Sequence, residues 1–286
     1  MTISHVTDLE LTVAHVRQAM SSAPAAEVVT AIRALVAGEL TTGRGFVVIR
    51  CSEDLTLNGA KRLVLSLSHV LGAVMPQDYH GEQIREVRDR GADITISRSA
   101  RYSDTRFGGH LHTDGMHRPG HIPDFFTLFC YRAAVRGGDS VFVHVDDIVD
   151  RLRAYDGVID VLQQEFHFDS RDTSGIGPRT VRRPVLEPVQ GGMRINYIRE
   201  YIQSGHAEPG VPPLTSDQLR ALDAVDAVLA DTTLHRHARL HRGDLMVIDN
   251  RRLVHGRTDF VDSEEPDRRR LLLRTWIDAR PTGGRV

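Results

Sequence analysis

The sequence predicts an α+β protein with a barrel or jelly-roll core of strands and flanking helices, on three observations. Amphipathic helical patterns come first in the chain, short β-branched runs dominate the rest, and strands do not alternate with helices as in a parallel sheet. The chain has 286 residues, enough for one large buried core, and no internal repeat, low-complexity tract or linker divides it. We therefore expect a single domain over residues 1–286.

The first quarter of the chain predicts two helices and one strand. Apolar residues recur every three or four positions over residues 24–40 and again over residues 55–72, which is typical of amphipathic helices. Between them, residues 46–50 form a short β-branched run after the turn at residues 42–45, and this run predicts a buried strand.

Most of the later elements are predicted strands. Residues 92–98 alternate apolar and polar side chains with a period of two, as a half-buried strand does. Four further apolar runs predict strands at residues 125–132, 140–144, 244–249 and 270–277.

Two helices and a short strand are predicted between these runs. Residues 146–152 predict a short helix, and residues 193–197 predict a strand. Residues 215–229 predict a helix with an apolar face, and Thr215 and Gln218 are placed to form a capping box at its start.

Composition argues against several classes of protein. The net charge of -2 lacks the basic excess of a nucleic-acid-binding protein, so no nucleic-acid partner is expected. The N-terminus does not resemble a signal peptide and no apolar run reaches the roughly 18 residues of a membrane span, which predicts a cytoplasmic protein with no membrane partner. Cys51 and Cys130 lie in or beside apolar runs, so we expect buried free thiols rather than a disulfide. The chain has no CxxC motif, so a zinc-thiolate site is not expected.

Two motifs far apart in the chain predict a metal site. His112 and Asp114 are two residues apart, so on an extended segment both side chains point to the same side. His255 stands just beyond the predicted strand at residues 244–249. Two histidines and one carboxylate form the facial triad of non-haem Fe(II) oxygenases, whose open positions accept a chelating 2-oxo acid and O₂.

A third motif, Arg270-Leu-Leu-Leu-Arg274, predicts a carboxylate anchor. Residues four apart on a strand share a face, so both guanidiniums point the same way. A guanidinium grips a carboxylate through two parallel hydrogen bonds, which suits the distal carboxylate of 2-oxoglutarate. Because residues 268–270 are all arginine, the strand register is open, and the pairing with Arg274 selects Arg270 as the inward-facing residue.

At these residues the sequence resembles the TauD/TfdA family of Fe(II)/2-oxoglutarate dioxygenases. Within the family the resemblance is to the branch around clavaminate synthase, γ-butyrobetaine hydroxylase and the amino-acid β-hydroxylases. It extends from about residue 45 to residue 277. The motifs that carry it are Gly45-Phe-Val-Val-Ile-Arg50, His112-Thr-Asp114-Gly115, Gly137-Gly-Asp-Ser140, Gly243-Asp244 with Asp249-Asn250-Arg251, His255-Gly-Arg257, and Arg270 with Arg274.

The resemblance implies a double-stranded β-helix core and a role for each motif residue. It implies His112, Asp114 and His255 as iron ligands and Arg270 as the 2-oxoglutarate anchor. Ser140 falls where the family often has a threonine that contacts the cosubstrate. Arg274 falls where some members place an arginine near carboxylates of substrate or cosubstrate. The intact carboxylate of Asp114 argues against the halogenating subgroup, in which that position is small.

The reaction that the resemblance implies consumes 2-oxoglutarate and O₂ and releases succinate and CO₂. An unactivated C–H bond of a small polar substrate is hydroxylated, or the substrate is desaturated or cyclised. Amino-acid-like molecules and natural-product intermediates are the substrates that we expect. The order of assembly is not readable from the sequence, so a homo-oligomer is left open.

Segments outside the core strands are expected to set the substrate. Residues 76–110 and 156–213 are rich in arginine and are expected to cover the pocket, and residues 156–235 are expected to be an insertion between core strands. Within this insertion, the predicted substrate-binding residues are Arg194, Asn196 and Tyr197.

Two other functions were weighed against the oxygenase. His110, His112 and Asp114 also resemble the first motif of a metallo-β-lactamase-type two-metal hydrolase, but that motif needs a histidine where Gly115 stands. It would also leave residues 243–274 unexplained. The third alternative is a non-catalytic β-barrel binding module, which would not require a metal triad.

Overall fold

The computed structural model describes residues 2–3, 6–51, 53–91, 102–172, 174–189 and 191–280. The predicted strand at residues 92–98 lies outside the described residues. Elsewhere helices and strands mix as predicted, and the protein is of the α+β class.

A seven-stranded sheet forms the centre of the molecule. Its strand order is β2-β3-β14-β6-β17-β4, with β5 also paired to β17, and all neighbours are antiparallel except β2 and β3. The strands are β2 (Leu9–Leu11), β3 (Phe46–Cys51), β4 (Ala73–Met75), β5 (Arg85–Val87), β6 (Phe125–Arg132), β14 (Asp244–Asp249) and β17 (Leu271–Asp278). Four of these strands match the predicted runs within one residue at each end, because each is a continuous apolar or β-branched segment buried in the sheet.

A four-stranded sheet, in the order β1-β13-β8-β15, faces the larger one. Its strands are β1 (Thr2–Ile3), β13 (Arg236–Ala238), β8 (Ser140–His144) and β15 (Leu253–Arg257), and a separate pair joins β7 (Arg136–Gly137) to β16 (Phe260–Val261). One apolar cluster takes buried side chains from both sheets. Within it the rings of Phe46 in β3 and Phe142 in β8 stack with centroids 4.9 Å apart. The two sheets therefore pack face to face with a shared core.

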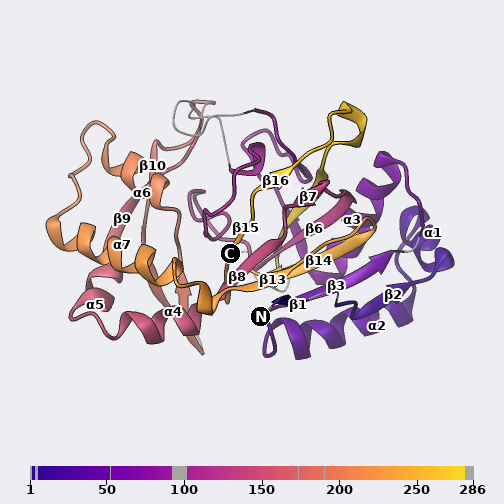
Figure 1. Cartoon of the computed structure of the whole chain (residues 1–286), viewed down its shortest axis with the longest axis horizontal. Helices are drawn as coiled ribbons and strands as arrows, with labels where there is room; N and C mark the ends of the chain where they lie inside the picture. Colours follow the sequence, from indigo (N-terminus) through magenta and orange to yellow (C-terminus); the bar gives the residue numbers. More distant parts are fainter. Residues whose placement is uncertain are drawn as a thin grey trace.

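Three N-terminal helices cover the other face of the larger sheet (Figure 1). They are α1 (Val13–Ser21), α2 (Ala26–Leu35) and α3 (Leu57–Leu71), and the π-helical turn η1 (Val36–Leu40) extends α2. The predicted helix over residues 24–40 thus changes its hydrogen-bonding pattern partway along. Cys51 and Cys130 are buried free thiols, as predicted.

The residues between β8 and β13 build a second packed region on the outer face of the smaller sheet. It contains α4 (Val145–Leu152), α5 (Val158–Leu162), β9 (Glu165–Asp169), β10 (Thr180–Pro184), β11 (Leu186–Val189), β12 (Gly192–Ile195), α6 (Arg199–His206) and α7 (Ser216–Leu229). Figure 1 shows α5, α6, α7 and the β9–β10 hairpin at the opposite end of the molecule from α1 and α2. The predicted capping box is present at the start of α7, where Thr215 and Gln218 bond reciprocally.

No single helix in the described ranges is long and apolar enough to cross a membrane. One bent pair of helices, Val13–Ser21 with Ala26–Leu40, meets the length and composition test when taken together. Both of these helices contribute buried side chains to the core beside the larger sheet.

Candidate active site

Two backbone hydrogen bonds bring the two predicted metal motifs together. The amide of His112 donates to the carbonyl of His255, and the amide of His255 donates to the carbonyl of His112, both at 2.8 Å. This isolated antiparallel bridge attaches the His112 segment to the edge of β15. The two imidazole rings consequently lie with centroids 4.4 Å apart.

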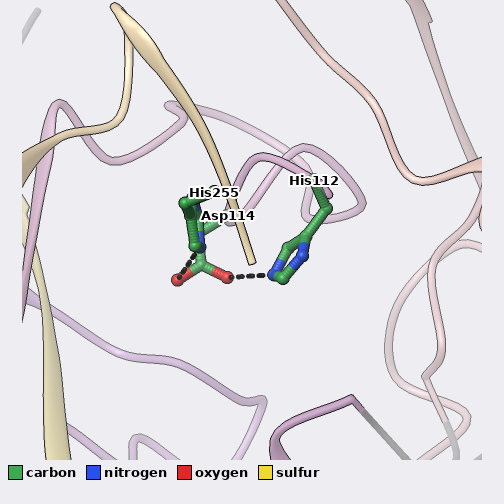
Figure 2. Close-up of side chains that lie close together, drawn as sticks. All are labelled: His112, Asp114 and His255. Atoms are coloured by element: carbon green, nitrogen blue, oxygen red, sulfur yellow. Dashed lines mark ion pairs between the residues drawn. The ribbon is translucent and has the colours of Figure 1, made fainter. Parts of the chain in front are cut away.

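Asp114 lies between the two imidazoles (Figure 2). Its Oδ1 is 3.8 Å from Nε2 of His112, and its Oδ2 is 4.0 Å from Nε2 of His255. The three potential ligand atoms all lie within 4.8 Å of one another. That spacing, with two nitrogens and one carboxylate oxygen, can accept a metal ion.

Hydrogen bonding and burial prepare the two histidines as neutral ligands. Nδ1 of His112 lies 2.8 Å from the carbonyl oxygen of His110, which can only accept, so Nδ1 carries the proton and Nε2 keeps its lone pair. Burial lowers the pKa of His112, and burial together with nearby His112 lowers the pKa of His255 to about 3. The ring of His255 packs on Phe126 with centroids 4.3 Å apart, and its buried Nδ1 has no hydrogen-bond partner in the described part of the chain.

The carboxylate of Asp114 is ionised although it is buried. Burial opposes ionisation, but the Arg274 guanidinium and the hydrogen bond from Trp276 hold the pKa of Asp114 well below its ordinary value. NH1 of Arg274 lies 3.0 Å from both carboxylate oxygens, and the indole Nε1 of Trp276 donates to Oδ2 at 3.0 Å. Neutral imidazoles and an ionised carboxylate are the donors that Fe(II) accepts in a facial triad, so the residues fit that metal.

Asn250 holds the main chain of Asp114 in place. Its Oδ1 accepts from the amide of Asp114 at 2.8 Å, and its Nδ2 donates to the carbonyl of Asp114 at 3.0 Å and to that of Pro123 at 2.9 Å. Asn250 was part of the quoted motif, but no role was predicted for it. The sequence signal that could have suggested a role is an asparagine five residues before a predicted ligand histidine.

An open cavity of about 610 Å³ between the two sheets contains the triad. Ser140, Arg270 and Arg274 line the same cavity as His112, Asp114 and His255, so all six predicted metal and cosubstrate residues meet there.

Arg270 is a buried cation that has no anionic partner among the described residues. Only 5% of the residue is exposed, and its guanidinium makes no ion pair or hydrogen bond with any described residue. It packs over the ring of Phe260 at 4.9 Å, and burial lowers the pKa of Arg270 to about 10. A buried unpaired guanidinium is costly, so this cavity fits a carboxylate ligand at that point. Arg268 and Arg269 are both exposed, and the register predicted for Arg270 is the one observed.

Arg257 is a cavity residue that sequence reasoning missed. It follows His255 by two positions in β15, so the two share a face, and Ser140 of β8 lies opposite it in the register. It packs on the same Phe260 ring as Arg270, at 4.9 Å, and NH2 donates to the backbone and hydroxyl oxygens of Thr105. Its place in the His-Gly-Arg motif was a sufficient sequence signal.

The predicted substrate residues Arg194, Asn196 and Tyr197 do not line this cavity in the described structure. Arg194 lies 3.7 Å from Asp124, and the amide of Asn196 donates to the carbonyl of Pro184 at 3.0 Å. The backbone of Tyr197 bonds to Thr113, and Tyr197 lines a neighbouring cavity together with His110 and His112. Alternation along the predicted strand placed Arg194 and Asn196 on one face and Tyr197 on the other. In the structure β12 ends at Ile195, and Tyr197 packs in the core of the second region.

The predicted covering segments contribute unequally to the cavity. Among the described residues, the lining from residues 76–110 includes Ser103, Phe107 and Gly108, whereas residues 156–213 supply none of it. From this second segment, residues 197–200 line the neighbouring cavity instead.

His110 is not part of the metal-binding group. Its Nδ1 lies 3.3 Å from Glu200, and the cluster of potential ligand atoms is formed by the other two histidines and Asp114. The arrangement therefore does not favour a two-metal hydrolase built on His110.

A two-sheet α+β fold with a buried two-histidine, one-carboxylate group beside a buried arginine is typical of the Fe(II)/2-oxoglutarate-dependent dioxygenases. Residues 22–276 match the family described as "Taurine catabolism dioxygenase TauD, TfdA family". The chain belongs to this family.

Two curated relatives are streptomycete proteins. FR-33289 synthase of Streptomyces rubellomurinus (strain ATCC 31215) is 26% identical over 247 residues, covering 84% of this chain and 70% of the relative. Uridine-5'-phosphate dioxygenase of Streptomyces sp is 29% identical over 187 residues, covering 60% of this chain and 66% of the relative.

Solved structures of iron oxygenases share the fold. Asparagine oxygenase in complex with Fe(II), 2S,3S-3-hydroxyasparagine and succinate superimposes with a TM-score of 0.69 at 20% identity, covering 96% of this chain and 94% of that one. The non-haem iron oxygenase OrfP in complex with Fe and α-ketoglutaric acid gives a TM-score of 0.69 at 17% identity, covering 96% and 95%.

Proposed function

We propose that this dioxygenase hydroxylates, desaturates or cyclises a small anionic substrate at an unactivated C–H bond, with His112, Asp114 and His255 as its iron ligands. The observation that carries the assignment of ligands is their convergence in one cavity with the buried guanidinium of Arg270, which has no anionic partner among the described residues. Iron bound there supplies activation of O₂ coupled to decarboxylation of 2-oxoglutarate, with succinate and CO₂ as products.

The protein's own residues have separable tasks in this proposal. Nε2 of each histidine offers a lone pair, and Asp114 supplies the negative charge that a divalent cation requires. Arg270 binds the distal carboxylate of 2-oxoglutarate, and Ser140 lines the same cavity as a further hydroxyl contact. Arg274 reaches the cavity beside Asp114, where it would also be available to a carboxylate of substrate or cosubstrate.

The charge of the cavity supports an anionic substrate. Among the described residues, its lining contains three guanidiniums, those of Arg257, Arg270 and Arg274, and one carboxylate, that of Asp114. With Fe(II) and dianionic 2-oxoglutarate present, positive charge is still in excess, so an anionic group on the substrate would be attracted. One relative is named for a nucleoside phosphate, and neighbouring structures hold hydroxylated asparagine and arginine. We infer an amino-acid-like molecule or an anionic natural-product intermediate.

For the fold, we propose a double-stranded β-helix core within a single domain over residues 1–286. The two facing sheets and the shared core between them support it. Residues 156–235 would be an insertion between the core strands β8 and β13, which are neighbours in one sheet. Within the family we place the chain in the branch around clavaminate synthase and the amino-acid β-hydroxylases, supported by the likeness to asparagine oxygenase.

The ligand assignment is tested with metal-free protein to which Fe(II) and 2-oxoglutarate are added anaerobically. Wild type should develop the weak visible absorption of the Fe(II)–2-oxoglutarate chelate. His255→Ala should lose it, whereas His110→Ala should retain it because His110 lies outside the cluster of ligand atoms. Absence of the band in wild type, with tight zinc binding that needs His110, would instead support the hydrolase.

The substrate class is tested by succinate release in matched pairs of compounds. Amino acids are compared with their amides and esters, and uridine 5'-phosphate with uridine. We expect turnover to require the anionic member of a pair. A screen in which only uncharged apolar compounds respond would contradict the proposed class.

A further inference from the structure

Two neighbouring side chains of β17 reach the carboxylate of Asp114. Arg274 and Trp276 are two residues apart on a strand and therefore share a face. The strand is paired on both sides at Trp276, with Phe126 of β6 and Met75 of β4. Only 1% of Trp276 is exposed, so the indole cannot turn freely and its N–H direction is fixed by packing.

The two side chains restrain the carboxylate in different ways. NH1 of Arg274 lies 3.0 Å from Oδ1 and 3.0 Å from Oδ2, so it attracts the group without distinguishing its oxygens. The indole donates to Oδ2 alone, at 3.0 Å. Trp276 therefore breaks the symmetry, and Oδ1 is left facing Nε2 of His112 at 3.8 Å.

We propose that Trp276 is a positioning residue that selects Oδ1 of Asp114 as the metal-binding oxygen and thereby sets the metal affinity of the site. The proposal rests on the proposed role of Asp114 as an iron ligand. A buried indole N–H needs an acceptor, and here that acceptor belongs to a ligand carboxylate, which is the usual task of outer-shell partners. Loss of such a partner typically costs about 10- to 100-fold in metal affinity.

The first test is anaerobic titration of metal-free protein with Co(II) alone, followed by its visible absorption. We expect Trp276→Phe to bind Co(II) at least about 10-fold more weakly than wild type, with an altered spectrum. The matched control is Thr275→Val, on the opposite face of the same strand. It loses buried hydroxyl contacts at 2.8 and 2.7 Å to Ser68 and Thr127 and should bind Co(II) as wild type does.

The second test uses protein with an intact Trp276, so it remains possible if Trp276→Phe does not fold. Trp276 is the single tryptophan of the chain, so tryptophan fluorescence reports on this indole alone. Adding Zn(II) to wild type should shift the emission in step with binding, and Asp114→Asn should abolish the shift. Unchanged Co(II) affinity and spectrum in folded Trp276→Phe, or emission unaffected by bound Zn(II), would overturn the proposal. If wild type binds neither metal, it is the proposed ligand set that fails.

Discussion

At the scale of single residues, the charged side chains of the cavity differ in their partners. Asp114 and Arg274 pair with each other, whereas Arg270 has no anionic partner among the described residues. Asp114 accepts from Arg274 and Trp276, so its negative charge is matched before any metal arrives. Arg270 has no such match in the described part of the chain, although it is buried. A buried cation of this kind creates a strong preference for an anionic ligand.

Replacing Arg270 should therefore weaken binding of 2-oxoglutarate. Arg270→Ala removes a paired ionic contact worth about 2–4 kcal/mol, which corresponds to a rise of roughly 30- to 700-fold in the KM for 2-oxoglutarate. Arg270→Lys keeps the charge but not the paired geometry, so its KM for 2-oxoglutarate should lie between those of wild type and Arg270→Ala. Arg269→Ala is the control, because Arg269 is exposed. Steady-state succinate release measures all three, and a normal KM in Arg270→Ala would refute the anchor.

The histidines predict a pH dependence of stability in the metal-free protein. Burial lowers the pKa of His255 from 6.5 to about 3, so the folded state stays neutral while the unfolded state takes up a proton below pH 6.5. Because the unfolded state then binds more protons, the free energy of unfolding should fall as pH drops from 6.5 towards 3. Urea unfolding at several pH values measures this. His255→Phe should show a shallower fall than wild type, and equal slopes would contradict the prediction.

At the scale of elements, the site depends on contacts between segments rather than within them. The His112–Asp114 segment is fixed by β15 through its backbone bridge, by the turn after β14 through Asn250, and by β17 through Trp276. Each contact comes from a different segment of the chain. Local secondary structure alone would leave Asp114 without a defined direction.

Removing the amide of Asn250 should loosen this segment. Asn250→Ala deletes three buried hydrogen bonds and should lower the free energy of unfolding by about 2–4 kcal/mol, as well as weakening Co(II) binding. Arg251→Gln in the same turn loses the ion pair with Asp249 at 2.7 Å but no contact with Asp114. It should retain Co(II) affinity. Equal metal affinity in wild type and Asn250→Ala would show that the hydrogen bonds of Asn250 do not position Asp114.

At the scale of the whole molecule, the active site links the two packed regions on either side of the smaller sheet. Oγ1 of Thr113 donates to the carbonyl of Ile195 at 3.1 Å and accepts from the amide of Tyr197 at 3.0 Å. Thr113 lies between two predicted iron ligands, so the segment after β12 is attached directly to the metal motif.

Thr113→Val should uncouple these regions while preserving side-chain shape. The carbonyl of Ile195 and the amide of Tyr197 lose their hydrogen bonds to the hydroxyl. The free energy of unfolding should fall by about 1–3 kcal/mol. Hydrogen exchange followed by mass spectrometry should show faster exchange in β12 and the start of α6, with β14 unchanged. Uniform exchange across both regions would indicate that the hydroxyl does not couple them.

The sequence by itself determined the elements and the chemical types at the site. Apolar runs located β6, β8 and β14 to the residue, and the pattern of Thr215 and Gln218 located the start of α7, because these features depend on periodicity and capping within a few positions. Histidine, aspartate and arginine at their spacings indicated an iron and 2-oxoglutarate chemistry, and family membership confirms that class.

Only the tertiary structure decided how those groups are held. It set Trp276, 162 positions along the chain, against Asp114, and it placed Arg257 beside Arg270 on the ring of Phe260. It also turned the Arg194–Tyr197 segment into the second packed region rather than the cavity. These outcomes depend on which faces of distant segments meet, and the free energy of that packing is shared among many residues, so no local pattern specifies it.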